Sequence, residues 1–136
     1  MSQSTLDDLA KLLLRLTLGV LIVFHGWAKI KGGTGGIEAM LAMRGWPTFI
    51  AWGVYVGEVV APLLLMLGVY TRAAAAVVAI NMVVAVLLAH SGHFADFTST
   101  GGWRLELQAM FLIASIVVAM LGAGRYAIGG NGGRWN

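Results

Sequence analysis

Four long apolar runs constrain the fold of this chain more than any other feature of its sequence. Each run holds roughly 17–22 residues, and an α-helix of that length crosses a hydrocarbon core of about 30 Å. Inside lipid the backbone has to satisfy its own hydrogen bonds, so helices are the default structure there. The sequence therefore predicts an all-α fold, a four-transmembrane-helix bundle that forms an integral membrane protein. The predicted spans cover approximately residues 9–30, 48–67, 72–90 and 105–122.

The composition agrees with a lipid environment and excludes several classes of function. Hydrophobic residues make up 59% of the chain and charged residues 11%, whereas an ordinary soluble domain has about 25% charged residues. The chain has no cysteine, which excludes disulfides, thiolate metal sites and cysteine-ligated iron–sulfur clusters. Its cationic residues are scattered. The expected surroundings are therefore membrane lipid, and nucleic acid is not expected as a partner.

We expect a single domain over residues 1–136, because no linker-like block divides the chain. The two longer connections, residues 31–47 and 91–103, are glycine-rich and are typical of loops. Within the first of them, residues 37–43 could form a short interfacial helix. Four spans place both loops on one side of the membrane, and a slight excess of Lys and Arg on the other side favours cytoplasmic termini. Residues 125–136 are predicted to be a flexible tail.

Glu58 lies near the middle of the second run and is the strongest single indication of a functional site. A charge near the bilayer centre costs about 2.5–3.5 kcal/mol and usually faces the bundle interior or a wet cavity. The carboxyl group can remain protonated, or it can pair with a cation. Arg15, His25 and Lys29 fall near one face of the first run at 100° per residue. We expect Arg15 to pair with Glu58, although the tilt of helical side chains toward each amino terminus opposes that pair.

Other polar residues are predicted to form a shallow mouth on the loop side of the bundle. Asn81 lies near the middle of the third run, and Gln108 and Ser115 share one face of the fourth. The residues expected around the mouth are His25, Lys29, His90, His93, Arg104 and Glu106. Two histidines on different helices, His25 and His90, could ligate haem. Interfacial histidines are commoner than haem ligands, so haem is not expected, and no metal site is predicted.

The spacing of several motifs resembles one family of membrane proteins. The first run reads RLTLGVLIVFHGWAKI, with Arg15, Gly19, Phe24, Gly26 and Lys29. The second run contains Gly57–Glu58 and ends in LGVYTR, and the fourth begins near Glu106 and is followed by GAGRYAIGG. In order and spacing these motifs resemble the DoxX family of small four-helix membrane proteins. The resemblance implies a protein of the bacterial plasma (inner) membrane, similar to the membrane subunit of thiosulfate:quinone oxidoreductase.

Two classes of function follow, and the sequence leaves open whether the protein is an enzyme. In the first, a redox subunit binds a quinone at the loop-side mouth and receives electrons from a partner protein. Proton exchange would involve the carboxylates and histidine at the candidate catalytic positions, which are His25, Glu58 and Glu106. The candidate ligand-binding residues are Arg15, Lys29, Asn81, His90 and Arg72. Lys29 would favour an anionic form of the ligand.

In the second class, the protein is a non-catalytic membrane scaffold or a small-ligand-binding protein. The Arg15–Glu58 pair would then be purely structural and, with Arg72, would fix the register of the helices. A transporter for a small acid is a third interpretation, and it would require a homo-oligomer because four helices form little of a pathway alone.

Overall fold

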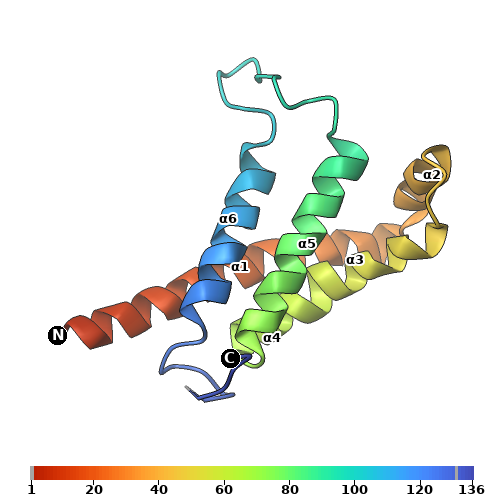
Figure 1. Cartoon of the computed structure of the whole chain (residues 1–136). Helices are drawn as coiled ribbons and strands as arrows, with labels where there is room; N and C mark the ends of the chain where they lie inside the picture. Colours follow the sequence, from red (N-terminus) through yellow and green to blue (C-terminus); the bar gives the residue numbers. More distant parts are fainter. Residues whose placement is uncertain (1, 131) are drawn as a thin grey trace.

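The computed structural model describes residues 2–130 and 132–136, and its long regular elements are helices (Figure 1). Those ranges contain no β-strand, and an isolated bridge pairs Phe97 with Trp103. η1 is a 3₁₀-helix and η2 a π-helix. The elements in chain order are α1 (Gln3–Gly32), α2 (Gly35–Met43), η1 (Thr48–Trp52), α3 (Gly53–Tyr55), η2 (Val56–Val60), α4 (Ala61–Leu67), α5 (Thr71–Ala89) and α6 (Glu106–Leu121). The prediction of an all-α fold is confirmed.

Three helical stretches are long and apolar enough to cross a membrane. They are α1, the continuous stretch Thr48–Leu67 and α5. The predicted runs at 48–67 and 72–90 nearly coincide with the second and third of these, and the predicted interfacial helix corresponds to α2. α6 is apolar but has 16 residues, which extend about 24 Å. Three helices, rather than the predicted four, therefore reach the length that a span requires.

The long helices pack as two pairs that diverge from a common end. α1 packs along α4, and α5 packs along α6. The pairs meet at the turn between α4 and α5 and separate toward the opposite end, where α2 lies (Figure 1). Below, these are called the closed end and the open end of the fold. A core of buried apolar residues joins the pairs: Leu18, Ile22, Ala61, Leu65, Ala74, Ala75, Val78, Met82, Phe111 and Val118. The opening between the pairs creates the space in which the site lies.

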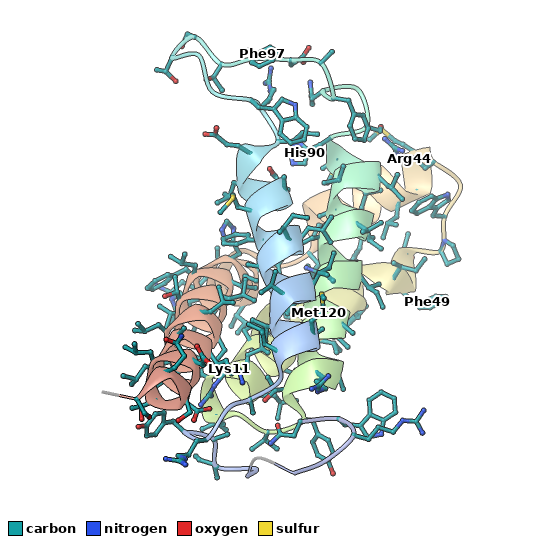
Figure 2. All side chains as sticks on the ribbon, turned by 60° about the vertical axis from the view of Figure 1, so that its left-hand side comes forward. Lys11, Arg44, Phe49, His90, Phe97 and Met120 are labelled. Atoms are coloured by element: carbon teal, nitrogen blue, oxygen red, sulfur yellow. The ribbon has the colours of Figure 1, made fainter. Side chains whose placement is uncertain are left out.

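Large apolar side chains are exposed on the outside of the molecule. Phe49, Phe97 and Met120, which Figure 2 labels, are each at least 70% exposed. Soluble monomers rarely expose extended apolar surface, whereas lipid hydrocarbon solvates it. The outer surface therefore agrees with the length of the helices in pointing to a membrane environment.

The end of the chain crosses the closed end of the fold. The flexibility predicted for residues 125–136 stays a prediction, and the described residues of this segment form long-range hydrogen bonds. The amides of Ile128 and Gly129 donate to the carbonyls of Leu67 and Gly68, at 3.0 and 3.1 Å. The amide of Arg72 donates to the carbonyl of Trp135 at 3.0 Å, and Thr71 donates to the Asn136 side chain. The glycine-rich composition had suggested flexibility, but it also lets this segment lie close to the α4–α5 turn.

Candidate functional site

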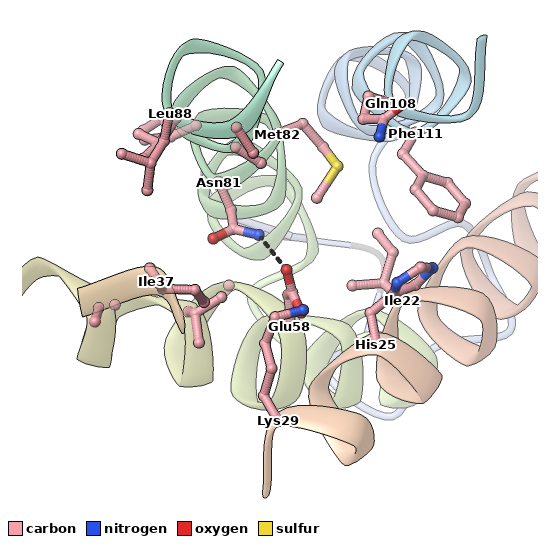
Figure 3. Close-up of a pocket in the computed structure, with 18 of the residues that line it drawn as sticks. Ile22, His25, Lys29, Ile37, Glu58, Asn81, Met82, Leu88, Gln108 and Phe111 are labelled. Atoms are coloured by element: carbon pink, nitrogen blue, oxygen red, sulfur yellow. Dashed lines mark hydrogen bonds and ion pairs between the residues drawn. The ribbon is translucent and has the colours of Figure 1, made fainter. Parts of the chain in front are cut away.

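Glu58 is buried and each of its carboxylate oxygens accepts a hydrogen bond from a different helix. The side chain of Lys29, from α1, lies with Nζ 2.7 Å from Oε2. Asn81, from α5, donates from Nδ2 to Oε1 at 3.2 Å (Figure 3). Glu58 is 5% exposed, and a buried charge is tolerated when it is both paired and hydrogen-bonded. Lys29, Glu58 and Asn81 are referred to below as the Glu58 cluster.

The backbone that carries Glu58 is a single π-helical turn. The amide of Ala61 bonds to the carbonyl of Val56, five residues earlier. Pro62 has no N–H, so the carbonyl of Glu58 cannot receive the usual bond from the residue four positions later. Gly26 of α1 lies directly against that carbonyl, and a Cβ atom at Gly26 would overlap it. π-turns within helices occur frequently at functional sites, so the backbone distortion itself marks this position.

Gly57 lets Asn81 reach the carboxylate. A Cβ atom on Gly57 would lie 2.5 Å from Cγ of Asn81 and 2.7 Å from its Oδ1. Any larger residue would therefore push α5 away from the π-turn and lengthen the hydrogen bond to Glu58. The dipeptide Gly57–Glu58 acts as one unit, in which the first residue makes space for the partner of the second.

A cavity of about 600 Å³ lies beside the Glu58 cluster, at the open end of the fold. Its size is within the range of about 300–1,000 Å³ that is usual for small-molecule sites, and its mostly apolar wall with few polar groups is also typical of them. α1, α2, the stretch from η1 to η2, α5 and α6 all contribute to the wall. The polar residues among its lining are His25, Lys29, Glu58, Asn81, His90 and Gln108.

Two further contacts lie on the wall of this cavity. The Nε2 atom of His90 is 3.2 Å from the amide Nε2 of Gln108. The rings of His25 and Phe111 meet edge to face, with centroids 5.9 Å apart and planes at 82°. α6 therefore contributes an amide and an aromatic face to a site whose charged residues come from α1 and η2.

The prediction that Arg15 pairs with Glu58 is wrong. Arg15 is 1% exposed and donates to the carbonyls of Leu65 and Met66 at 2.9 and 2.8 Å, and to that of Tyr126. Two of these carbonyls belong to the last turn of α4, where backbone acceptors lack helical partners and a cation is favourable. Helical side chains tilt toward their own amino termini, so in these antiparallel helices Arg15 and Glu58 extend in opposite directions. Lys29 takes the place that had been assigned to Arg15.

The remaining predicted site residues divide between the cavity and other parts of the fold. His25, Lys29, Glu58, Asn81 and His90 all line the cavity. Arg72 lies at the closed end, where it donates to the carbonyl of Ala119 at 3.3 Å and to the main-chain oxygen of Asn136 at 3.1 Å. Glu106 is exposed at the first residue of α6. The roles proposed for these residues stay predictions, but the structure brings five of the eight together.

Sequence reasoning missed Gln108 as a site residue and missed the π-turn. Gln108 carried a signal, since it is an amide in the first turn of an otherwise apolar helix. The signal for the π-turn was Pro62, four residues after Glu58. The apolar wall supplied by Ile37 and Met40 of α2 had no local signal, because it depends on how the loop folds back. Within residues 2–130 and 132–136, no group of three or more His, Asp or Glu side chains is arranged to hold a metal ion.

Helices of membrane-spanning length, a lipid-compatible surface and a buried ion pair beside an apolar cavity define a small helical integral membrane protein. Residues 10–91 match the model of the DoxX family, and the chain belongs to that family. The matched region runs from α1 to just past α5 and so includes every residue of the Glu58 cluster. Neither the curated proteins nor the solved structures contain a match to this chain.

Proposed function

We propose that this DoxX-family protein is the membrane subunit of a redox system, and that it binds a quinone in the cavity beside Glu58. The observation that carries the proposal is a buried, fully hydrogen-bonded carboxylate on the wall of a mostly apolar cavity of about 600 Å³. Such a wall suits a lipid-soluble ring. The chain has no cysteine, so electrons would come from a partner protein.

The residues around the cavity fit the requirements of a quinone. Ring oxygens require hydrogen-bond donors, which the Lys29 ammonium group and the Asn81 amide supply. The ring requires apolar or aromatic neighbours, and Phe111 lies on the wall. Ile37 and Met40 of α2 extend that wall and suit an apolar tail. A quinone supplies two-electron, two-proton redox chemistry when it is bound.

The Glu58 cluster can hold both charge and protons for that chemistry. The ammonium group of Lys29 favours negative charge that develops on a nearby oxygen. Glu58 can hold a proton or release it to an adjacent acceptor. When Glu58 is neutral, Lys29 loses its ionic partner and becomes available to an anionic ligand atom. Asn81 orients the carboxylate in either state, and His25 provides a second titratable group on the same cavity.

We further propose that α6 is the fourth span, in a bacterial inner membrane with cytoplasmic termini. α6 packs along α5 over much of its length, so the two helices would share one depth in the bilayer. The open end and its cavity would then lie toward the non-cytoplasmic side.

Binding of a short-chain quinone to purified protein in detergent tests the proposal, with tryptophan fluorescence as the readout. Glu58→Gln removes the charge and preserves the shape, and we expect it to raise the Kd about tenfold, a change of roughly 1.4 kcal/mol. Glu38→Gln is the matched control on α2, away from the cluster, and should bind as the unmodified protein does. Equal binding by Glu58→Gln and the unmodified protein, both folded, would contradict the proposal.

The alternative is a scaffold in which buried charges serve packing alone. Arg15 favours this alternative. In the described part of the chain its buried charge bonds only to main-chain carbonyls, so a buried charge in this chain can have a purely structural role. On this alternative Glu58→Gln lowers the melting temperature in detergent, and the unmodified protein shows no saturable binding of quinone.

A further inference from the structure

A second group of polar atoms lies on the cavity wall, separate from the Glu58 cluster. His90 is the residue that follows α5, and Gln108 lies in the first turn of α6. Their side chains are 3.2 Å apart, and because an amide nitrogen can only donate, Nε2 of His90 accepts. The other end of the amide, Oε1 of Gln108, is buried and has no hydrogen-bond partner in the part of the chain that the structure describes. Buried acceptors of this kind are rare and costly.

The position of Gln108 gives it a role different from that of Glu58. Asn81 and His90 are nine residues apart, which corresponds to about 13 Å along α5. One ring cannot contact both groups at once. Phe111 lies one turn after Gln108 on the same helix and meets the ring of His25 (Figure 3). The Gln108 side chain therefore lines the cavity beside an aromatic residue, in a part of it distinct from the ion pair.

We propose that Gln108, oriented by His90, is a specificity-determining residue that accepts a hydrogen bond from a hydroxyl group of an amphiphilic ligand. This inference rests on the proposed quinone function and deepens it. Reduction adds two electrons from the partner protein and two protons, which converts both ring carbonyls into hydroxyls. A carbonyl offers Gln108 no hydrogen, whereas a hydroxyl does. Lys29 and Asn81 of the Glu58 cluster carry donors, which suit the carbonyls of the oxidised ring, and Gln108 carries an acceptor, which suits a hydroxyl of the reduced ring.

A matched pair of probes isolates this hydrogen bond from redox chemistry. A 4-alkylphenol and its methyl ether have the same ring and chain, but only the phenol has a donor. We expect the protein to bind the phenol about tenfold more tightly than the ether, since one hydrogen bond of roughly 1.4 kcal/mol changes the Kd tenfold. Gln108→Leu should weaken phenol binding about tenfold and leave ether binding unchanged. Gln3→Leu, the same substitution at the start of α1, should change neither.

Equal binding of phenol and ether by the unmodified protein would overturn the inference, and so would an equal loss of both in Gln108→Leu. The first result would mean that Gln108 accepts no hydrogen bond from the ligand, and the second that it acts only through the shape of the cavity wall. The comparison of the two probes on the unmodified protein does not depend on the folding of the variant. A preference for phenol without any quinone binding would refute the proposed function and retain the hydroxyl site. Quinone binding without a preference for phenol would support the proposed function and refute the hydroxyl site at Gln108.

Discussion

Arg15 and Glu58 are both buried charges on the same pair of helices, and they are stabilised in different ways. Arg15 lies at the closed end and bonds to main-chain carbonyls of α4 and of the segment that follows α6. Glu58 lies at the open end and accepts from two side chains, Lys29 and Asn81. Both are almost completely removed from solvent, at 1% and 5% exposure. Depth of burial therefore does not distinguish them.

The chemical nature of the partners does distinguish them. Main-chain carbonyls are fixed by the helix and do not exchange protons, so the contacts of Arg15 serve to join α1 to α4. The partners of Glu58 are side chains, and one of them is itself charged and partly exposed, with 26% of the Lys29 side chain accessible. A cavity lies beside Glu58. The comparison teaches that, among buried charges, those held by side chains next to a cavity are the candidates for function.

Removal of Arg15 should have the largest effect on stability. Arg15→Leu leaves carbonyls at the end of α4 without donors, and we expect it to lower the free energy of unfolding by about 3 kcal/mol. Thermal unfolding in detergent, followed by circular dichroism, measures the loss. Arg125→Leu is the control, because Arg125 is largely exposed, and it should change stability by less than about 0.5 kcal/mol. Similar losses of unfolding free energy in Arg15→Leu and Arg125→Leu would contradict a special structural role for Arg15.

A methyl group at Gly26 should have an intermediate effect. In Gly26→Ala the new Cβ meets the Glu58 carbonyl, so α1 must move away from the π-turn at a cost of about 2 kcal/mol. The displacement should also weaken quinone binding, which Arg15→Leu should affect only through unfolding. Gly36→Ala in α2 is the control, since its Cβ meets no atom within 4 Å. A stable Gly26→Ala variant with normal binding would show that the close approach is dispensable.

The smallest expected effect concerns the ion pair. Lys29→Met leaves Glu58 without its cation and should cost about 1 kcal/mol, because the pair is partly exposed. The double variant Lys29→Met, Glu58→Gln should recover part of that loss, since no unpaired charge remains. A double-mutant cycle on unfolding free energies measures the coupling. Strict additivity would mean that the 2.7 Å contact contributes nothing to stability.

The sequence predicted the helices well because hydropathy alone determines them. It also identified Glu58, Lys29, Asn81, His25 and His90, all of which line one cavity. It assigned Glu58 the wrong partner because a helical wheel gives the face of a residue and not the end of the bundle toward which its side chain extends.

Long-range contacts explain the other differences between prediction and structure. The segment after α6 forms hydrogen bonds with residues some sixty positions earlier, such as Leu67 and Thr71. The role of Gln108 depends on where His90 lies, and the cavity wall from α2 depends on the path of a loop. None of these can be read from local periodicity.

The π-turn at Val56–Val60 also sets the rotational phase of the span around it. Each residue of an α-helix turns the chain by about 100°. The extra residue in this turn therefore changes which face the helix after it presents relative to the helix before it. Shortening the span by one residue at Val59 would remove the extra residue of the π-turn and keep Leu65 in the core, while Glu58 would lose its present orientation toward Lys29 and Asn81. The same deletion a few residues further on would rotate Leu65 out of the core. A one-residue deletion in this span is therefore compatible with folding only at the π-turn. The π-turn is also the part of the span that carries the Glu58 carboxylate.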